Sequence, residues 1–308
     1  MISNKDISFG VIEIGSNTTK SVIAFKKENE ILFSEDLIIT GRLSGNPNND
    51  MSLSNNLISK NIEIVCDLYS KLKQSKVEKI FIIATEALRK SRDSKKFVSQ
   101  IESMLELNVQ ILSPKEEAFY ALNSIKTNNS KLCFDIGGAS TELILKEINQ
   151  EEFHSISIGA VTLNNLVKKD ISEFDKLDDF LSLCYDFLSK YFNIINLTNL
   201  SSDIECYGIG GTYVSSYMII KSIVNFYQSD IHLKSVNYKD FIVILNTLHK
   251  TPLKKRNKII GLDFDRADIL AFGIAINCYL MNKFKINQLF ISTYGVRHGF
   301  IKHKLLGF

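Results

Sequence analysis

The sequence has few of the features that mark a membrane, secreted or metal-cluster protein. It contains three prolines and five cysteines in 308 residues. The cysteines are Cys66, Cys133, Cys184, Cys206 and Cys278. They are scattered in apolar runs, and no two have the spacing of a metal-ligand pair. They therefore predict small buried side chains in a reducing compartment rather than disulfides or a zinc site.

Long apolar runs and a strong net charge are also missing. The longest apolar run, around 267–281, is too short and too interrupted to span a bilayer, and the first ten residues lack a secretory pattern. Lys and Arg number 37 against 34 acidic residues, a net charge of +3, so any basic site must be local. The aromatic residues are dispersed and form no stacking platform for nucleic acid. We predict a cytoplasmic protein with no nucleic-acid or membrane partner, and leave a homodimer open.

Strand-like and helix-like segments alternate along the chain, which predicts an α/β fold. The length suits two domains. A polar stretch at 126–131 is a natural boundary. We therefore expect an N-terminal domain at 1–125 and a C-terminal domain at 126–308, with the last helix, 296–308, free to pack back on the first domain.

Local patterns predict individual elements. Apolar spacing predicts helices at 53–74, 86–107, 113–125, 238–249, 265–283 and 296–306, and strands at 9–14, 21–25, 31–39, 79–85, 109–112 and 288–293. We expect a further strand across 151–163, and strand, glycine turn and helix over 203–220. Ser113 is a good N-cap because Pro114 follows it and Glu116 lies three residues later.

One pattern occurs twice. Residues 12–23, IEIGSNTTKSVI, align with residues 134–145, FDIGGASTELIL. Each copy reads apolar, carboxylate, Ile, Gly, two small residues, hydroxyl, Thr and a charge. Glu13 and Asp135 are 122 residues apart, about one domain. The repeat predicts two similar domains, each opening with a strand–turn–strand.

The glycine turns of this repeat suit phosphate. Backbone N–H groups exposed at such a bend form an anion-binding nest, and glycine lets the anion approach closely. The available hydroxyls are those of Ser16, Thr18, Thr19, Ser140 and Thr141. A third turn, GIGGT at 208–212, leads into a helix whose N-terminus favours a phosphate. A carboxylate before each of the first two turns repels phosphate unless a magnesium ion or a water lies between them.

Eight ordered blocks carry a family resemblance that covers nearly the whole chain. They are IEIGSNTTK (12–20), ATEALRKS (84–91), ILSPKEEA (111–118), FDIGGASTEL (134–143), SIGAVTL (157–163), GIGGT (208–212), GLDFDRAD (261–268) and STYGVRHG (292–299). The chain resembles the short, two-domain branch of the exopolyphosphatase/guanosine pentaphosphate phosphohydrolase (Ppx/GppA) family, in the actin-like ATPase superfamily. The resemblance implies two RNase H-like domains with mixed sheets flanked by helices, and an active site in the cleft between them. It also implies release of terminal phosphate from polyphosphate or from guanosine pentaphosphate, with magnesium or manganese.

The resemblance also assigns roles to residues. The proposed base falls on Glu117 and the phosphate-neutralising arginine on Arg89. Metal-associated carboxylates fall on Asp135 and Glu142, with Glu13 and Glu117 as further candidates. The phosphate-binding positions are Ser16, Asn17, Thr18, Lys20, Gly137, Gly138, Ser140, Thr141, Gly210, Gly211 and Thr212.

The chain departs from the family pattern at four of these positions or their neighbours. Glu13 stands where the family usually has Asp, and Lys20 stands where it usually has Arg, which loses a bidentate fork. Ala139 stands where the family has a third glycine, and His298 stands where the family often has Glu. These departures bear on metal and chain-length preference.

Other interpretations stay open. Taken by spacing alone, Glu117 supports a capped helix, Glu142 is a solvent-facing strand residue and Arg89 is a solvated charge. The basic run 253–258 either guides a polyanion or forms a solvated loop, and Arg266 is expected to fix a helix end. Two other function classes fit the paired loops: an actin-like kinase or ATPase, and a nucleotide sensor that binds without turnover.

Overall fold

The chain folds into two compact units. The computed structural model describes residues 7–27, 30–34, 36–43, 52–127, 129–148, 150–197, 200–201 and 203–307. One unit comprises Met1–Ile125 together with Gly295–Phe308, and the other comprises Lys126–Tyr294. The second unit therefore ends before the last helix, whereas the expected second domain ran to 308 with that helix free to pack back on the first domain.

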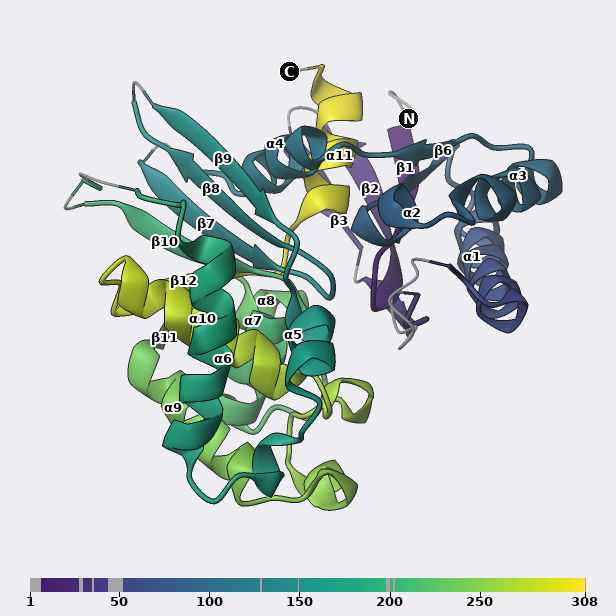
Figure 1. The fold of residues 1–308 in the computed structure, drawn as a ribbon. Coiled ribbons are helices and arrows are strands. Elements are labelled where there is room, and N and C mark those ends of the chain that lie inside the picture. The colour runs from purple at the N-terminus through teal and green to yellow at the C-terminus, as the bar shows by residue number, and fades with distance from the viewer. Residues whose placement is uncertain are drawn as a thin grey trace. The chain divides into compact units, whose positions relative to one another are not determined.

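The first unit is built on a mixed sheet (Figure 1). Its strands are β1 (Ile7–Ile14), β2 (Thr18–Lys27), β3 (Glu30–Phe33), β4 (Leu37–Thr40), β5 (Lys79–Ala84) and β6 (Val109–Ile111). The order is β3-β2-β1-β5-β6, and β4 also pairs with β2. The β1–β2 pair is the predicted strand–turn–strand and is antiparallel, whereas β1, β5 and β6 are parallel.

Helices cover both faces of this sheet. They are α1 (Asn55–Gln74), α2 (Glu86–Lys90), α3 (Ser94–Leu105), α4 (Pro114–Ser124) and α11 (Val296–Leu306). Ile12 and Ile14 of β1 share a core with α1 and α3. Residues that alternate with these along the strands point to the opposite face of the sheet, which α11 covers. Phe81 of β5, for example, makes a ring contact with Phe300 of α11. The predicted helix 86–107 is two helices, because Ser91 is extended and ends α2.

The second unit repeats the arrangement. Its strands are β7 (Lys131–Ile136), β8 (Thr141–Lys146), β9 (Glu151–Ile156), β10 (Glu205–Ile209), β11 (Ser235–Asn237) and β12 (Gln288–Ser292). The order is β11-β12-β10-β7-β8-β9. As in the first unit, three antiparallel strands, β9-β8-β7, continue into parallel strands, here β10 and β12. The short strand β11 was not predicted.

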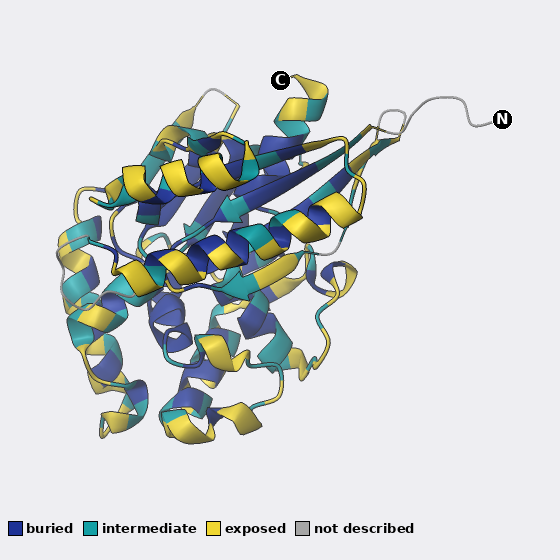
Figure 2. Cartoon of the chain, turned by 90° about the vertical axis from the view of Figure 1, so that its right-hand side faces the viewer, coloured by how far each residue is buried: buried dark blue, intermediate teal, exposed yellow. Residues whose placement is uncertain are grey.

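The helices of this unit are α5 (Ala160–Val167), α6 (Leu177–Phe192), α7 (Gly211–Lys221), α8 (Gln228–Ile231), α9 (Tyr238–His249) and α10 (Leu270–Lys283). Most contribute to one large apolar core with the strands. Exposed residues lie along the outer side of many helices, and buried residues concentrate on the strands (Figure 2). The predicted strand 151–163 was wrong in its second half, where α5 forms instead.

Two other expectations have clear outcomes. The five cysteines are free thiols, and four of them are buried. The basic run 253–258 is a 3₁₀ helix whose Arg256 is fully buried. Arg256 donates to Asp170 and to the carbonyls of Thr251 and Ala267, so it is a structural anchor rather than part of a solvated loop. In the part of the chain that the structure describes, no helix is long and apolar enough to cross a membrane.

Candidate functional site

In the first unit the predicted site residues follow the carboxyl ends of parallel strands. The register aligns Ile14 of β1 with Ala84 of β5, and Ala84 with Ile111 of β6. The first glycine turn, the segment with Arg89 and the helix with Glu117 begin just after these three positions. Parallel strands bring such connections to one edge of a sheet, which is where α/β proteins bind ligands.

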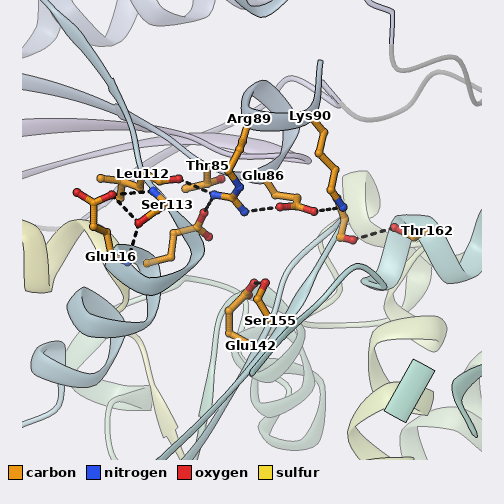
Figure 3. A network of polar contacts seen from close by, with 12 residues as sticks. Thr85, Glu86, Arg89, Lys90, Leu112, Ser113, Glu116, Glu142, Ser155 and Thr162 are labelled. Carbon is orange, nitrogen blue, oxygen red and sulfur yellow. Dashed lines mark hydrogen bonds and ion pairs between the residues drawn. The ribbon is translucent and has the colours of Figure 1, made fainter. Parts of the chain in front are cut away.

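Arg89 and Glu117 are in direct contact within this unit. The Arg89 guanidinium also donates to Glu86 (Figure 3) and, over 2.6 Å, to the carbonyl of Leu112. Glu86 in turn contacts Lys90, so two carboxylates and two cations alternate. Burial alone lowers the pKa of Arg89, but the contacts with Glu117 and Glu86 outweigh it and raise the pKa. Arg89 therefore stays charged beside a buried glutamate.

The local sequence holds Glu117 in this position. The capping box predicted at the start of α4 is present: the Ser113 hydroxyl accepts from the Glu116 N–H, and the Glu116 carboxylate accepts from the Ser113 N–H over 2.7 Å. Glu117 follows in the first helical turn with 5% of its surface exposed. The cap thus fixes the direction in which this side chain leaves the helix.

The first turn is closed by a hydrogen bond from the Gly15 N–H to the Thr18 carbonyl, over 3.1 Å. A Cβ at Gly15 would lie 2.8 Å from that carbonyl oxygen, so only glycine fits. Asn17 is buried, and among the described residues its Nδ2 has no hydrogen-bond partner. A buried donor without a partner carries a desolvation penalty that an anion would relieve.

Glu13, the carboxylate before this turn, is already paired with cations. Lys20 lies directly opposite it on β2, and Arg297 of α11 donates to it over 3.2 Å and also to Asp36. Burial alone raises the pKa of Glu13, but Lys20 and Arg297 outweigh it and lower the pKa. The arrangement favours a buried ion pair at Glu13; its role as a metal ligand stays a prediction.

The second turn closes in the same way. The Gly137 N–H donates to the Ser140 carbonyl over 2.9 Å, the same pairing as in the first turn 122 residues earlier. The carbonyls of Gly137 and Gly138 accept the N–H groups of Ala160 and Val161 at the start of α5, each over 2.9 Å. Helix α5 therefore holds the carbonyl side of the turn.

Residues at this turn differ in what they offer a phosphate. Among the described residues, the N–H groups of Gly138 and Ser140 donate to no backbone carbonyl, so they could donate to an anion. The hydroxyl of Thr141 is fully buried and donates to the Ile158 carbonyl over 2.6 Å. We therefore leave Thr141 out of the phosphate site.

Asp135 and Glu142 lie directly opposite each other on β7 and β8, and Ser155 lies opposite Glu142 on β9. All three side chains thus point to one face of the sheet. The Ser155 hydroxyl donates to Glu142 Oε1 over 2.9 Å (Figure 3). Like charges directly opposite in a sheet are destabilising, so this pair of carboxylates favours a cation beside it.

The third turn adjoins Asp135. Gly210 has φ +101°, which favours glycine, and a Cβ there would lie 3.3 Å from Asp135 Oδ1. A Cβ at Gly211, the first residue of α7, would lie 2.1 Å from the guanidinium of Arg266. Thr212 is buried against Gly273. Asp135 and two glycine turns therefore gather at one sheet edge of the second unit.

Asp135 and Glu142 fit a magnesium ion. Among the described residues, no group of three or more His, Cys, Asp or Glu side chains could hold a metal by itself. Magnesium is commonly bound by one or two carboxylates together with waters and substrate phosphates. The oxygen donors and the facing charges match that pattern.

Two residues of these clusters, Glu86 and Ser155, were not singled out from sequence. Arg266 was expected to fix a helix end; it is the last residue of a short 3₁₀ helix and also lies beside Gly211. Arg266 has 15% of its side chain exposed, and its ion pair with Asp263 spans 3.9 Å. Ser155 could be predicted only if the register of β9 against β8 were known. Arg266 lies 55 residues from Gly211 in the sequence, so no local pattern connects it to that turn.

Known structures share this fold. A member of the Ppx/GppA protein family from Aquifex aeolicus matches with a TM-score of 0.80 and 21% identity, covering 98% of this chain and 99% of that chain. An exopolyphosphatase from Cytophaga hutchinsonii matches with a TM-score of 0.83 and 18% identity, covering 97% and 98%. These likenesses show the two-domain, actin-like α/β fold.

A family comparison covers nearly the whole sequence. Residues 22–308 match the Ppx/GppA phosphatase family. The match includes all but the first of the eight sequence blocks and takes in Arg89, Glu117, Asp135 and Glu142. The chain belongs to the Ppx/GppA phosphatase family.

Proposed function

We propose that this protein releases terminal orthophosphate from inorganic polyphosphate, with guanosine pentaphosphate as its second substrate. The observation that carries the proposal is the contact between the Arg89 guanidinium and the buried Glu117 carboxylate at the carboxyl edge of a parallel sheet. Phosphoryl transfer needs a positioned water and charge neutralisation more than covalent catalysis, and these two groups supply both.

The proposed roles follow from the contacts. Glu117 orients the water and accepts its proton as the water oxygen bonds to the terminal phosphorus. The bond from that phosphorus to the bridging oxygen breaks, and the shortened chain keeps that oxygen. Arg89 neutralises charge on the transferring group. Phosphate oxygens are bound by Ser16, Asn17, Thr18, Lys20, Gly137, Gly138, Ser140, Gly210, Gly211 and Thr212, and we add Arg266.

Asp135 and Glu142 are the proposed metal ligands. Magnesium or manganese bound there would neutralise phosphate charge in the transition state. The chain's own part is to place two carboxylates directly opposite each other on adjacent strands, where a cation could bridge them. Glu13 and Glu117 also stay candidates from the family resemblance, although each is engaged by an arginine.

Glu117→Gln tests the proposed base. We expect phosphate release from polyphosphate to fall about 10²- to 10⁴-fold in kcat, the usual contribution of a positioned general base. The measurement is orthophosphate release from polyphosphate, guanosine pentaphosphate and ATP in parallel, with magnesium and after its removal by a chelator. Asp67→Asn, which changes an exposed carboxylate on α1, is the control and should act like wild type.

The same assay separates the alternatives. Turnover of ATP only when an acceptor is present would indicate a kinase. Tight nucleotide binding with no phosphate release from any substrate would indicate a sensor and would contradict our proposal.

A further inference from the structure

We propose that Ser155 is a positioning residue for the metal site: its hydroxyl orients the Glu142 carboxylate toward a divalent cation that Asp135 also binds. The inference rests on the proposed function of Asp135 and Glu142, and it adds a residue from a third strand. Ser155 lies outside every motif that carries the family resemblance.

The sheet register places the three side chains in one row. Asp135 pairs with Glu142 across β7 and β8, and Glu142 pairs with Ser155 across β8 and β9. Directly opposite residues in antiparallel strands have Cβ atoms about 4.5–5.5 Å apart on the same face. Glu142 therefore stands between a carboxylate on one side and a hydroxyl on the other.

The hydrogen bond has a direction that matters. The Ser155 hydroxyl donates to Glu142 Oε1 over 2.9 Å, which restrains the orientation of the carboxylate. Glu142 is 5% exposed, so water contributes little to orienting it. Metal-binding carboxylates are commonly held by such hydrogen bonds from neighbouring residues.

The first unit supplies an internal comparison. The corresponding row there is Glu13, Lys20 and Ile38 on β1, β2 and β4. Its carboxylate is matched by a lysine, and its third position is apolar. The hydroxyl therefore occurs in the row where two carboxylates face each other, and not in the row where a carboxylate faces a lysine.

The alternative is that the serine only pairs two strands. A cross-strand pair of that kind adds a small amount to folding stability and nothing to cation affinity. The two roles therefore differ in what Ser155→Ala changes: the structural role changes unfolding, whereas the positioning role changes metal binding in a folded protein.

The test is binding of Mn²⁺ alone to the full chain, followed by electron paramagnetic resonance of the free ion. For Ser155→Ala we expect the dissociation constant to rise about tenfold or more, and for Ser155→Thr, which restores a hydroxyl, a value close to wild type. Ser21→Ala is the matched control, because it removes a buried strand hydroxyl that has no hydrogen-bond partner among the described residues. Unfolding curves show that each variant is folded.

A second arm measures phosphate release against magnesium concentration. The half-saturating magnesium concentration should rise in Ser155→Ala while kcat at saturating magnesium stays near wild type. Unchanged Mn²⁺ affinity in folded Ser155→Ala, or no Mn²⁺ binding by wild type, overturns the inference. Wild type that binds Mn²⁺ but releases no phosphate contradicts the hydrolase proposal alone, and the Mn²⁺ arm still decides the role of Ser155.

Discussion

Arg89 contacts two carboxylates, and only one of them belongs to the proposed chemistry. Glu117 is the proposed base, whereas Glu86 bridges Arg89 and Lys90 from the start of α2. If the proposed function is right, a polyanionic substrate approaches a guanidinium that already pairs with Glu86. Glu86 would then limit the positive charge that the substrate meets.

Glu86→Gln should strengthen substrate binding. Removing this charge while keeping the side-chain shape should lower KM for polyphosphate roughly three- to fivefold, since one partly screened charge contributes up to about 1 kcal/mol. The value of kcat should change little because Glu117 is intact. Steady-state kinetics at low and high salt measure the effect, with Glu86→Asp as the charge-conserving control. A higher KM in Glu86→Gln would show that Glu86 positions Arg89 rather than competing for it.

The family resemblance, rather than spacing alone, predicted Arg89, Glu117, Asp135 and Glu142 as site residues, and the structure places Arg89 against Glu117 and Asp135 opposite Glu142. It did not single out Ser155, and it gave Arg266 no part in the site. The position of Arg266 over Gly211 depends on a tertiary contact, and the partner of Ser155 depends on strand register. A hydroxyl such as that of Thr141 also needs the structure, because only there is its acceptor, the Ile158 carbonyl, visible.

Among the elements, helix α4 depends on an acid-sensitive cap. The pKa of Glu116 is lowered, chiefly because its carboxylate accepts the Ser113 N–H. A group with a lowered folded-state pKa stabilises the protein fully above its unfolded value, here 4.5, and loses that contribution as pH falls through the folded value. Acidification below about pH 4.5 should therefore weaken the cap.

Glu116→Gln tests this effect. Its free energy of unfolding should lose the part of the acid dependence that Glu116 contributes, so that wild type and variant converge as the pH falls below 4.5. Urea unfolding at a series of pH values is the measurement. A constant difference between the two proteins across that range would mean that the carboxylate is not ionised in the cap.

The start of α5 is a second sensitive element. A Cβ at Gly159 would lie 2.5 Å from the Gly137 carbonyl oxygen and 2.6 Å from the backbone of Gly138. Gly159→Ala should therefore displace the second turn, destabilise the protein by about 1–3 kcal/mol and reduce phosphate release. Gly10→Ala is the control, since its Cβ would meet only side-chain atoms of Leu72 and Val77, the nearest at 3.0 Å. Equal stability loss in the two variants would argue against a backbone clash at Gly159.

The same element shows why one local prediction failed. Residues 151–163 read as a single strand because the apolar pattern continues past Ile156. Helix α5 begins at Ala160 because its first N–H groups reach the carbonyls of Gly137 and Gly138. Those acceptors lie more than twenty residues earlier, so no local pattern could predict the helix start. The two strand–turn–strand units, by contrast, are local and were predicted from the repeat.

For the molecule as a whole, the two units that the repeat predicts share a strand arrangement but differ in the charge that faces the first carboxylate. Each sheet runs from antiparallel strands into parallel ones, and the first two glycine turns close with the same hydrogen bond. The first unit adds Lys20 and Arg297 to its carboxylate, and the second faces its carboxylate with another. The two units therefore share a backbone arrangement and differ in the charges placed beside the first carboxylate of each sheet.

The last helix contributes much of the stability of the first unit. Helix α11 lies in that unit, where Phe300 and Ile301 are buried and Arg297 pairs with Glu13 and Asp36. Burying each of the two apolar side chains contributes about 1.5–3 kcal/mol. Removing Arg297 leaves the carboxylates of Glu13 and Asp36 without this cation, which costs about 3–5 kcal/mol. The total approaches the whole stability of a typical domain, about 5–15 kcal/mol.

A chain that ends at Tyr294 should therefore lose the fold of its first unit while the second stays folded. Hydrogen exchange resolved by fragment should show rapid exchange throughout β1, β2 and β5, with protection kept in β7 and β10. A chain that ends at Leu306 keeps α11 and is the control. Protected β1 and β2 in the shorter chain would mean that the packing of α1 and α3 on the opposite face is enough to hold the sheet.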